Sequence, residues 1–157
     1  MKSERVGLWL SLLANFGVLI GLFVLVVELR HNTLATQALL HQENVSFGRD
    51  NAELLIGDEN KELAEIVFRG ELDPESLSPN EFDKFFLFTS WRMAMWETQF
   101  LNYDTGLIGE RIWLGADGWF SALLQRGPGY RRWWEAARHG YDPAFQEHVD
   151  DVFKSQQ

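Results

Sequence analysis

The stretch VGLWLSLLANFGVLIGLFVLVV, from Val6 to Val27, contains no charged residue. Its 22 residues would span roughly 33 Å as an α-helix, which is enough to cross a hydrocarbon core of about 30 Å. A cleaved signal peptide is the alternative, but its apolar region is usually about 7–15 residues long and ends at a small-x-small site. The nearest such pattern, Thr36-Gln37-Ala38, lies well beyond the run. We therefore expect an uncleaved membrane anchor.

The basic residues beside this run indicate its orientation. Lys2 and Arg5 precede it and Arg30 follows it, and membrane proteins retain the more basic flank in the cytoplasm. We expect an N-terminal tail and anchor at residues 1–29 and a helical domain at residues 30–157. We expect a single-pass protein of a bacterial inner membrane. The orientation then predicts that the helical domain lies on the periplasmic side.

One face of the anchor carries small residues within a sector of roughly 120°. Lipid tails are as apolar as leucine, so membrane helices associate through close backbone contact, which small residues permit. Asparagine beside this face would prefer a hydrogen bond to another helix, worth about 0.6–2 kcal/mol. The alternative is that glycine is frequent in membrane helices without such a role. The predicted helix-association face consists of Gly7, Ser11, Ala14, Asn15, Gly17 and Gly21.

The rest of the chain has the pattern of helices. Ser78-Pro79-Asn80-Glu81 predicts a capping box with proline at the first helical position. Apolar residues then follow at spacings of four and three from Phe82 to Tyr103, which predicts a central helix. An earlier helix over 61–69 would end at Gly70. The predicted fold is all-α, with an N-terminal transmembrane helix that continues into a compact bundle of about five helices.

Composition argues against several functions. The 157 residues carry a net charge of -9, whereas nucleic-acid binding needs a surplus of Lys and Arg. There is no cysteine, and the four histidines lack the spacing of known metal motifs, so we expect no metal and no cofactor. Motifs of nucleophilic or phosphate-binding enzymes do not occur. Glu97 could have a raised pKa if it were buried, but a place on a polar strip is the simpler interpretation, and we expect no enzyme.

Charge is unevenly distributed along the domain. Residues 50–83 hold eleven acidic and two basic residues, whereas residues 118–141 hold four arginines and one glutamate. The basic segment also carries aromatic residues, and arginine with tryptophan is favoured at interfaces and lipid headgroups. It could contact the acidic segment of the same or a neighbouring subunit, touch anionic lipid, or be a solvated helix end with its tryptophans in the core. The candidate interaction surface is Arg126, Tyr130, Arg131, Arg132, Trp133, Trp134 and Arg138.

Two stretches resemble a loose, uncharacterised family of bacterial single-span membrane proteins. One runs from Asn15 through Gly21 into Val26–Asn32, and the other joins Trp133-Trp134-Glu135 to Tyr141–Phe145 and Val149-Asp150. The resemblance implies an anchor and a helical domain, and it supplies no catalytic residues.

These features together predict a membrane-anchored helical assembly protein. Its partners would be the lipid bilayer and either another copy of the chain or the helices of a larger membrane complex, to which it would be an accessory subunit. The alternative is a membrane-tethered ligand-binding or sensory domain, in which the seven tryptophans and twelve phenylalanines would line an apolar cavity.

Overall fold

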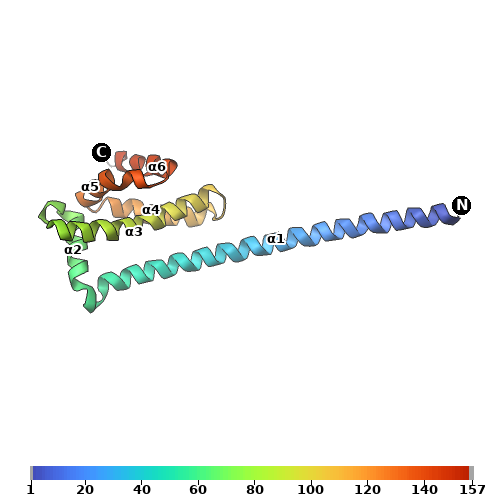
Figure 1. The fold of residues 1–157 in the computed structure, drawn as a ribbon, viewed down its shortest axis with the longest axis horizontal. Coiled ribbons are helices and arrows are strands. Elements are labelled where there is room, and N and C mark those ends of the chain that lie inside the picture. Colours follow the sequence, from blue (N-terminus) through green and yellow to red (C-terminus); the bar gives the residue numbers. More distant parts are fainter. Residues whose placement is uncertain (1, 156–157) are drawn as a thin grey trace. The chain divides into compact units, whose positions relative to one another are not determined.

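The computed structural model describes the backbone of residues 2–155 and the side-chain environments of residues 9, 10 and 12–155. The predicted all-α fold is confirmed, because a long N-terminal helix is followed by a helical bundle and the described residues contain no strand (Figure 1). The elements are α1 (Lys2–Ile56), η1 (Asp58–Asn60), α2 (Lys61–Leu72), η2 (Pro74–Ser76), α3 (Pro79–Asp104), α4 (Glu110–Leu124), α5 (Pro128–Ala137), η3 (Arg138–Gly140) and α6 (Pro143–Lys154).

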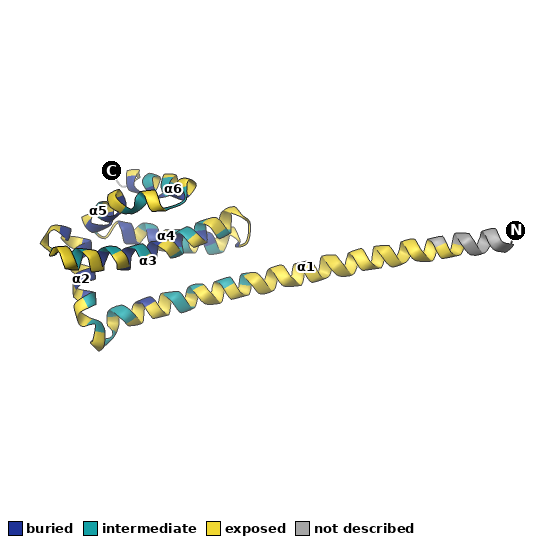
Figure 2. Cartoon of the chain, viewed as in Figure 1, coloured by how far each residue is buried: buried dark blue, intermediate teal, exposed yellow. Residues whose placement is uncertain are grey.

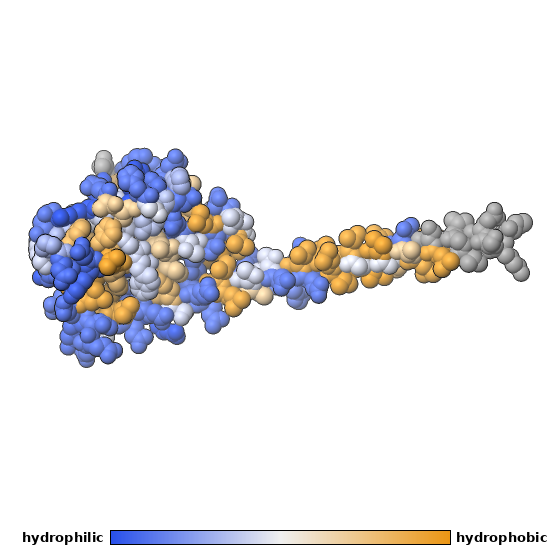
Figure 3. Space-filling view, in the orientation of Figure 1, coloured by the Kyte–Doolittle hydropathy of each residue, from blue (hydrophilic) through white to orange (hydrophobic). Residues whose placement is uncertain are grey.

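Helix α1 is continuous over 55 residues. No proline interrupts it, and the chain leaves the helix at Gly57, whose backbone is extended. The helix is long and apolar enough to cross a membrane. All residues from 12 to 27 are exposed, and Figures 2 and 3 show this part of the helix as an exposed, hydrophobic rod. Its apolar side chains are therefore not covered by packing within the described part of residues 1–43.

The chain divides into two compact units, residues 1–43 and residues 44–157. The second unit includes the end of α1, where the Phe47 ring lies 4.6 Å from that of Trp91 and the Gln99 amide donates to the Asn44 side chain. The predicted boundary between residues 29 and 30 lies two residues after the end of the apolar run at Val27. This boundary separates the predicted membrane anchor from the rest of the chain, whereas the division at residue 43 is one of packing. The boundary at residues 29 and 30 therefore stays a prediction.

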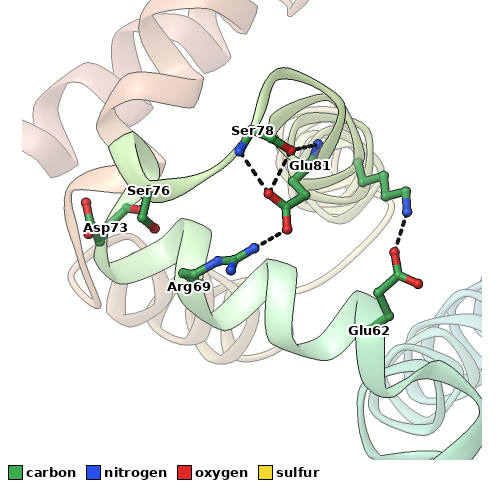
Figure 4. Close-up of polar contacts among 7 residues, drawn as sticks. Glu62, Arg69, Asp73, Ser76, Ser78 and Glu81 are labelled. Atoms are coloured by element: carbon green, nitrogen blue, oxygen red, sulfur yellow. Dashed lines mark hydrogen bonds and ion pairs between the residues drawn. The ribbon is translucent and has the colours of Figure 1, made fainter.

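Helix α3 begins with the predicted capping box, which is confirmed. The Glu81 N–H donates to the Ser78 hydroxyl, while the Ser78 N–H and hydroxyl donate to Glu81 Oε2 at 2.8 and 2.7 Å. Glu81 also pairs with Arg69 of α2, as Figure 4 shows. The cap thus satisfies the backbone N–H groups of Ser78 and Glu81 at the start of α3 and ties its first turn to α2.

The core of the second unit is aromatic. Trp96 of α3 is fully buried, with its ring stacked on Phe120 of α4 at 5.5 Å and against the edge of Phe145 of α6 at 5.2 Å. These offset and edge-on arrangements suit the charge distribution of aromatic rings. The predicted central position of α3 is confirmed, because the helix packs against α2, α4, α5 and α6.

The predicted end of α2 at Gly70 is wrong, because the helix continues to Leu72. Gly70 is buried, and an added Cβ would lie 2.6 Å from the Phe85 ring. The glycine is therefore needed for the close approach of α2 and α3, and not for a turn.

The capping box makes a prediction about acid stability. Hydrogen bonds from the Ser78 side chain and backbone, together with Arg69, lower the pKa of Glu81 from 4.5 to about 2. A lowered pKa means that the contribution of Glu81 to stability is complete above pH 4.5 and is lost as the pH falls towards 2. We expect an NMR titration of the Glu81 carboxyl carbon to show a midpoint near 2, and the stability gap between the wild type and Glu81→Gln to close over that interval. A midpoint near 4.5 would contradict the geometry.

Candidate interaction surface

The small face of the anchor is open in the described part of the chain. Ala14, Asn15, Gly17 and Gly21 are all exposed, and a Cβ added at either glycine would have no other atom within 4 Å. The environments of Gly7 and Ser11, which the prediction also places on this face, lie outside what the structure describes. Backbone atoms of a second helix could therefore approach closely at Gly17 and Gly21.

The basic segment differs from the surface that we expected. Tyr130, Trp133 and Trp134 are at most 4% exposed and lie in the core. The prediction that these three residues belong to an exposed interaction surface is therefore wrong. The three residues are spaced three and one apart on α5, so that they share one face of the helix and pack inward together.

The polar ends of these buried rings have specific partners. Trp133 Nε1 donates to the Ser90 hydroxyl at 2.9 Å, and Trp134 Nε1 donates to Asp150 Oδ1 at 2.7 Å. A buried indole N–H without a partner would lower stability. The two tryptophans thus fix α5 against α3 and α6, and their role is structural.

The arginines of the basic segment do face outward, and most of them are paired. Arg132 binds Glu75, and Arg126 Nη2 lies 3.1 Å from Glu71 Oε2. Both carboxylates belong to the acidic segment, so contact between the two segments occurs within one chain. Arg138 Nη2 instead donates to Asp150 Oδ2 at 2.6 Å. Arg131 has no carboxylate partner among the side chains of residues 9, 10 and 12–155.

A buried ionic network lies beneath this contact. The Glu71 and Arg92 side chains are only 1% and 4% exposed, and Arg92 Nη1 lies 3.4 Å from Glu71 Oε1. The Tyr130 hydroxyl donates to the same oxygen at 2.5 Å and accepts from Arg92 at 3.1 Å. Burial is the main cause that raises the pKa of Tyr130. The network joins α2, α3 and α5 through charges that are shielded from water.

Glu71 and Arg92 were not among the predicted site residues, although their positions in the sequence carry a signal. Glu71 follows Ala64 and Val67 at spacings of three and four on the buried face of α2, and Arg92 follows Phe85 and Phe88 in the same way on α3. An acid and a base at core positions of two helices are a recognisable pattern, because buried charges need partners.

A pocket of about 310 Å³ lies between α5 and α6. Three residues of the candidate surface, Arg131, Trp134 and Arg138, line this pocket. The other lining residues include residues of α6 that were not predicted as part of a site. Rings of Trp134 and Phe153 contribute apolar walls. The remaining lining is charged and consists of Arg131, Glu135, Arg138, Asp150 and Lys154.

Residues considered for catalysis have structural partners instead. Glu97 accepts a hydrogen bond from the Asp142 N–H at 2.5 Å, beside the start of α6. His148 Nε2 lies 2.6 Å from Asp117 Oδ1, which also accepts from Trp96 Nε1. The side chains described contain no group of three or more His, Asp and Glu residues that could hold a metal ion. Glu97 thus ties α3 to the N-cap of α6, and Asp117 ties α4 to both α3 and α6.

No family model, curated protein or solved structure matches the chain. The resemblance to bacterial single-span proteins therefore gains no support from them, and the function must be argued from the residues themselves.

Proposed function

We propose that the chain is a membrane-anchored assembly protein. Residues 6–27 would cross the membrane, and the small face of α1 would pack against another transmembrane helix. The partner is either a second copy or a helix of a larger membrane complex, in which this chain is an accessory subunit. The proposal also places the helical domain on the outer side of a bacterial inner membrane.

The open face at Gly17 and Gly21 is the observation that supports this proposal most. An added Cβ at either position has no neighbour within 4 Å, and the surrounding apolar side chains are exposed. A bilayer solvates leucine and phenylalanine well, so burying these side chains between helices gains little, whereas exposed glycines allow the backbones of two helices to pack closely. Association with a second helix would use the glycines for close backbone contact and would give Asn15 a hydrogen-bond partner.

The packing of the helical domain argues against the aromatic-cavity alternative. The Trp96 ring lies 5.5 Å from that of Phe120 and 5.2 Å from that of Phe145, so it fills the space between α3, α4 and α6 by packing on both rings. These rings therefore serve as core, and the alternative of an aromatic-lined cavity has no supporting observation at this place.

Replacing the glycines of the anchor should disrupt assembly. We expect Gly17→Ile with Gly21→Ile to reduce the mass of the particle extracted in mild detergent, because branched side chains would hold the helices apart. Native mass spectrometry or light scattering would measure the change.

A matched control uses the opposite face of the same helix. Leu19→Ile with Phe23→Ile introduces the same residue at positions about 180° away from the glycines, and the particle should keep its wild-type mass. The proposal fails if both double variants give the wild-type mass.

A further inference from the structure

The pocket between α5 and α6 contains one cation that is not neutralised. The Arg131 guanidinium lies 4.9 Å from the centre of the Phe153 ring and makes a long contact of 3.4 Å with the Phe153 carbonyl. Within the described residues it has no carboxylate partner. A guanidinium held on a ring at the edge of a pocket keeps its donors free for an anion.

The acids of the pocket leave this cation available, since Glu135, one turn further along α5, makes no ion pair with Arg131 within the described residues. Both oxygens of Asp150 already accept hydrogen bonds, from Trp134 Nε1 at 2.7 Å and from Arg138 at 2.6 Å. Lys154 pairs with Asp151 at 2.8 Å, but both side chains are more than 70% exposed. Such exposed pairs contribute little and exchange readily, so Lys154 can turn to a ligand.

The lining also indicates the charge of the ligand and the polarity of its remaining part. Arg138 is paired with Asp150 and Lys154 with Asp151, so the lining charges without an ion-pair partner in the described residues are Arg131 and Glu135. Arginine binds carboxylates through two parallel hydrogen bonds. The apolar walls from Trp134 and Phe153 suit a short hydrocarbon or aromatic body, and about 310 Å³ is at the lower end of small-molecule sites.

We propose that this pocket binds a small organic monocarboxylate. Its carboxylate pairs with Arg131 and Lys154, and its apolar part lies against Phe153 and Trp134. This inference goes beyond assembly, because it does not involve the anchor, and either proposal can fail without the other.

Ligand-observed NMR with benzoate tests the proposal, using the full chain in nanodiscs of uncharged lipid. We expect saturable binding of benzoate and none of benzyl alcohol, which has the same ring without the charge. Arg131→Gln should weaken benzoate binding at least about tenfold, because a charge-assisted contact is lost. Arg111→Gln makes the same change at an exposed site on α4, outside the pocket, and should leave binding unchanged.

Several results would overturn the inference. These are no saturable benzoate binding, equal binding of benzyl alcohol, or equal weakening by the two arginine variants. Arg131→Lys serves as a second variant, since it keeps the charge and should retain part of the affinity. Binding of vesicles that contain anionic phospholipid, without binding of benzoate, would assign the surface to lipid instead and would also overturn the proposal.

Discussion

Glu71→Ala should lower the free energy of unfolding of the helical domain by about 3–5 kcal/mol, because it leaves the buried guanidinium of Arg92 without its carboxylate. Arg92 is 3% exposed, so water cannot replace the lost partner. The Tyr130 hydroxyl would also lose its acceptor. Six of the seven tryptophans lie in this domain, and their fluorescence during thermal unfolding of the detergent-solubilised chain should show the midpoint falling by more than about 10 °C.

Glu75→Ala is the matched control. Glu75 pairs with Arg132 at the surface, where its side chain is 79% exposed, so its removal should cost less than about 1 kcal/mol. Replacing both buried charges, as in Glu71→Leu with Arg92→Met, should recover part of the lost stability, because no buried charge remains unpaired, while the Tyr130 hydroxyl still lacks its acceptor. Similar losses in Glu71→Ala and Glu75→Ala would show that the network is not shielded from water.

Gly129→Ala should be the most damaging of the glycine substitutions, with an expected loss of about 3 kcal/mol. A methyl group at Gly129 would overlap the carbonyl oxygen of Gly70, and one at Gly127 would overlap that of Glu71. Both obstacles are backbone atoms of α2, so no side chain can rotate away to make room. Urea unfolding followed by tryptophan fluorescence would measure the loss.

Gly115→Ala provides the comparison within the same domain. Gly115 lies inside α4, is exposed, and has no atom within 4 Å of an added Cβ. Alanine there should raise stability by about 0.5–1 kcal/mol, because it favours the helix more than glycine does. If Gly129→Ala were as well tolerated as Gly115→Ala, the close contact between α5 and α2 would be wrong.

Much of the fold could be predicted because its signals are local. The capping box at Ser78 and the proline at the start of α3 depend on four consecutive residues, and apolar spacing determines which side of a helix is buried. The end of α2 was mispredicted because glycine has two uses. It can stop a helix, or, as at Gly70, it can let a ring such as that of Phe85 approach, and only the packing partner distinguishes them.

The basic segment shows where composition misleads. Tyrosine and tryptophan are residue types that favour interfaces, and this composition led to the prediction of an exposed surface. The spacing of Tyr130, Trp133 and Trp134, however, is that of one helical face. The neighbouring arginines Arg131 and Arg132 lie off that face. Residue type alone therefore suggested a mixed surface, whereas helical periodicity separates a buried aromatic side from a charged outer side.

Some features depend on contacts between distant parts of the chain, which no local pattern specifies. Glu71 and Arg92 are 21 residues apart, and Tyr130 is 59 residues from Glu71. Each could be recognised as a polar residue at a core position, but only the packing of α2, α3 and α5 shows that they meet. The pocket between α5 and α6 has the same origin, because its lining comes from two helices.

Photo-crosslinking in the native membrane tests the central claim most directly. Benzoylphenylalanine is introduced singly at Val18 or Leu25, which lie within the small sector of α1, or at Phe16 or Phe23 on the other side. Assembly through the small face predicts strong crosslinks to a protein from Val18 and Leu25, and only lipid adducts from Phe16 and Phe23. Equal protein crosslinking from all four positions, or lipid adducts alone, would contradict it.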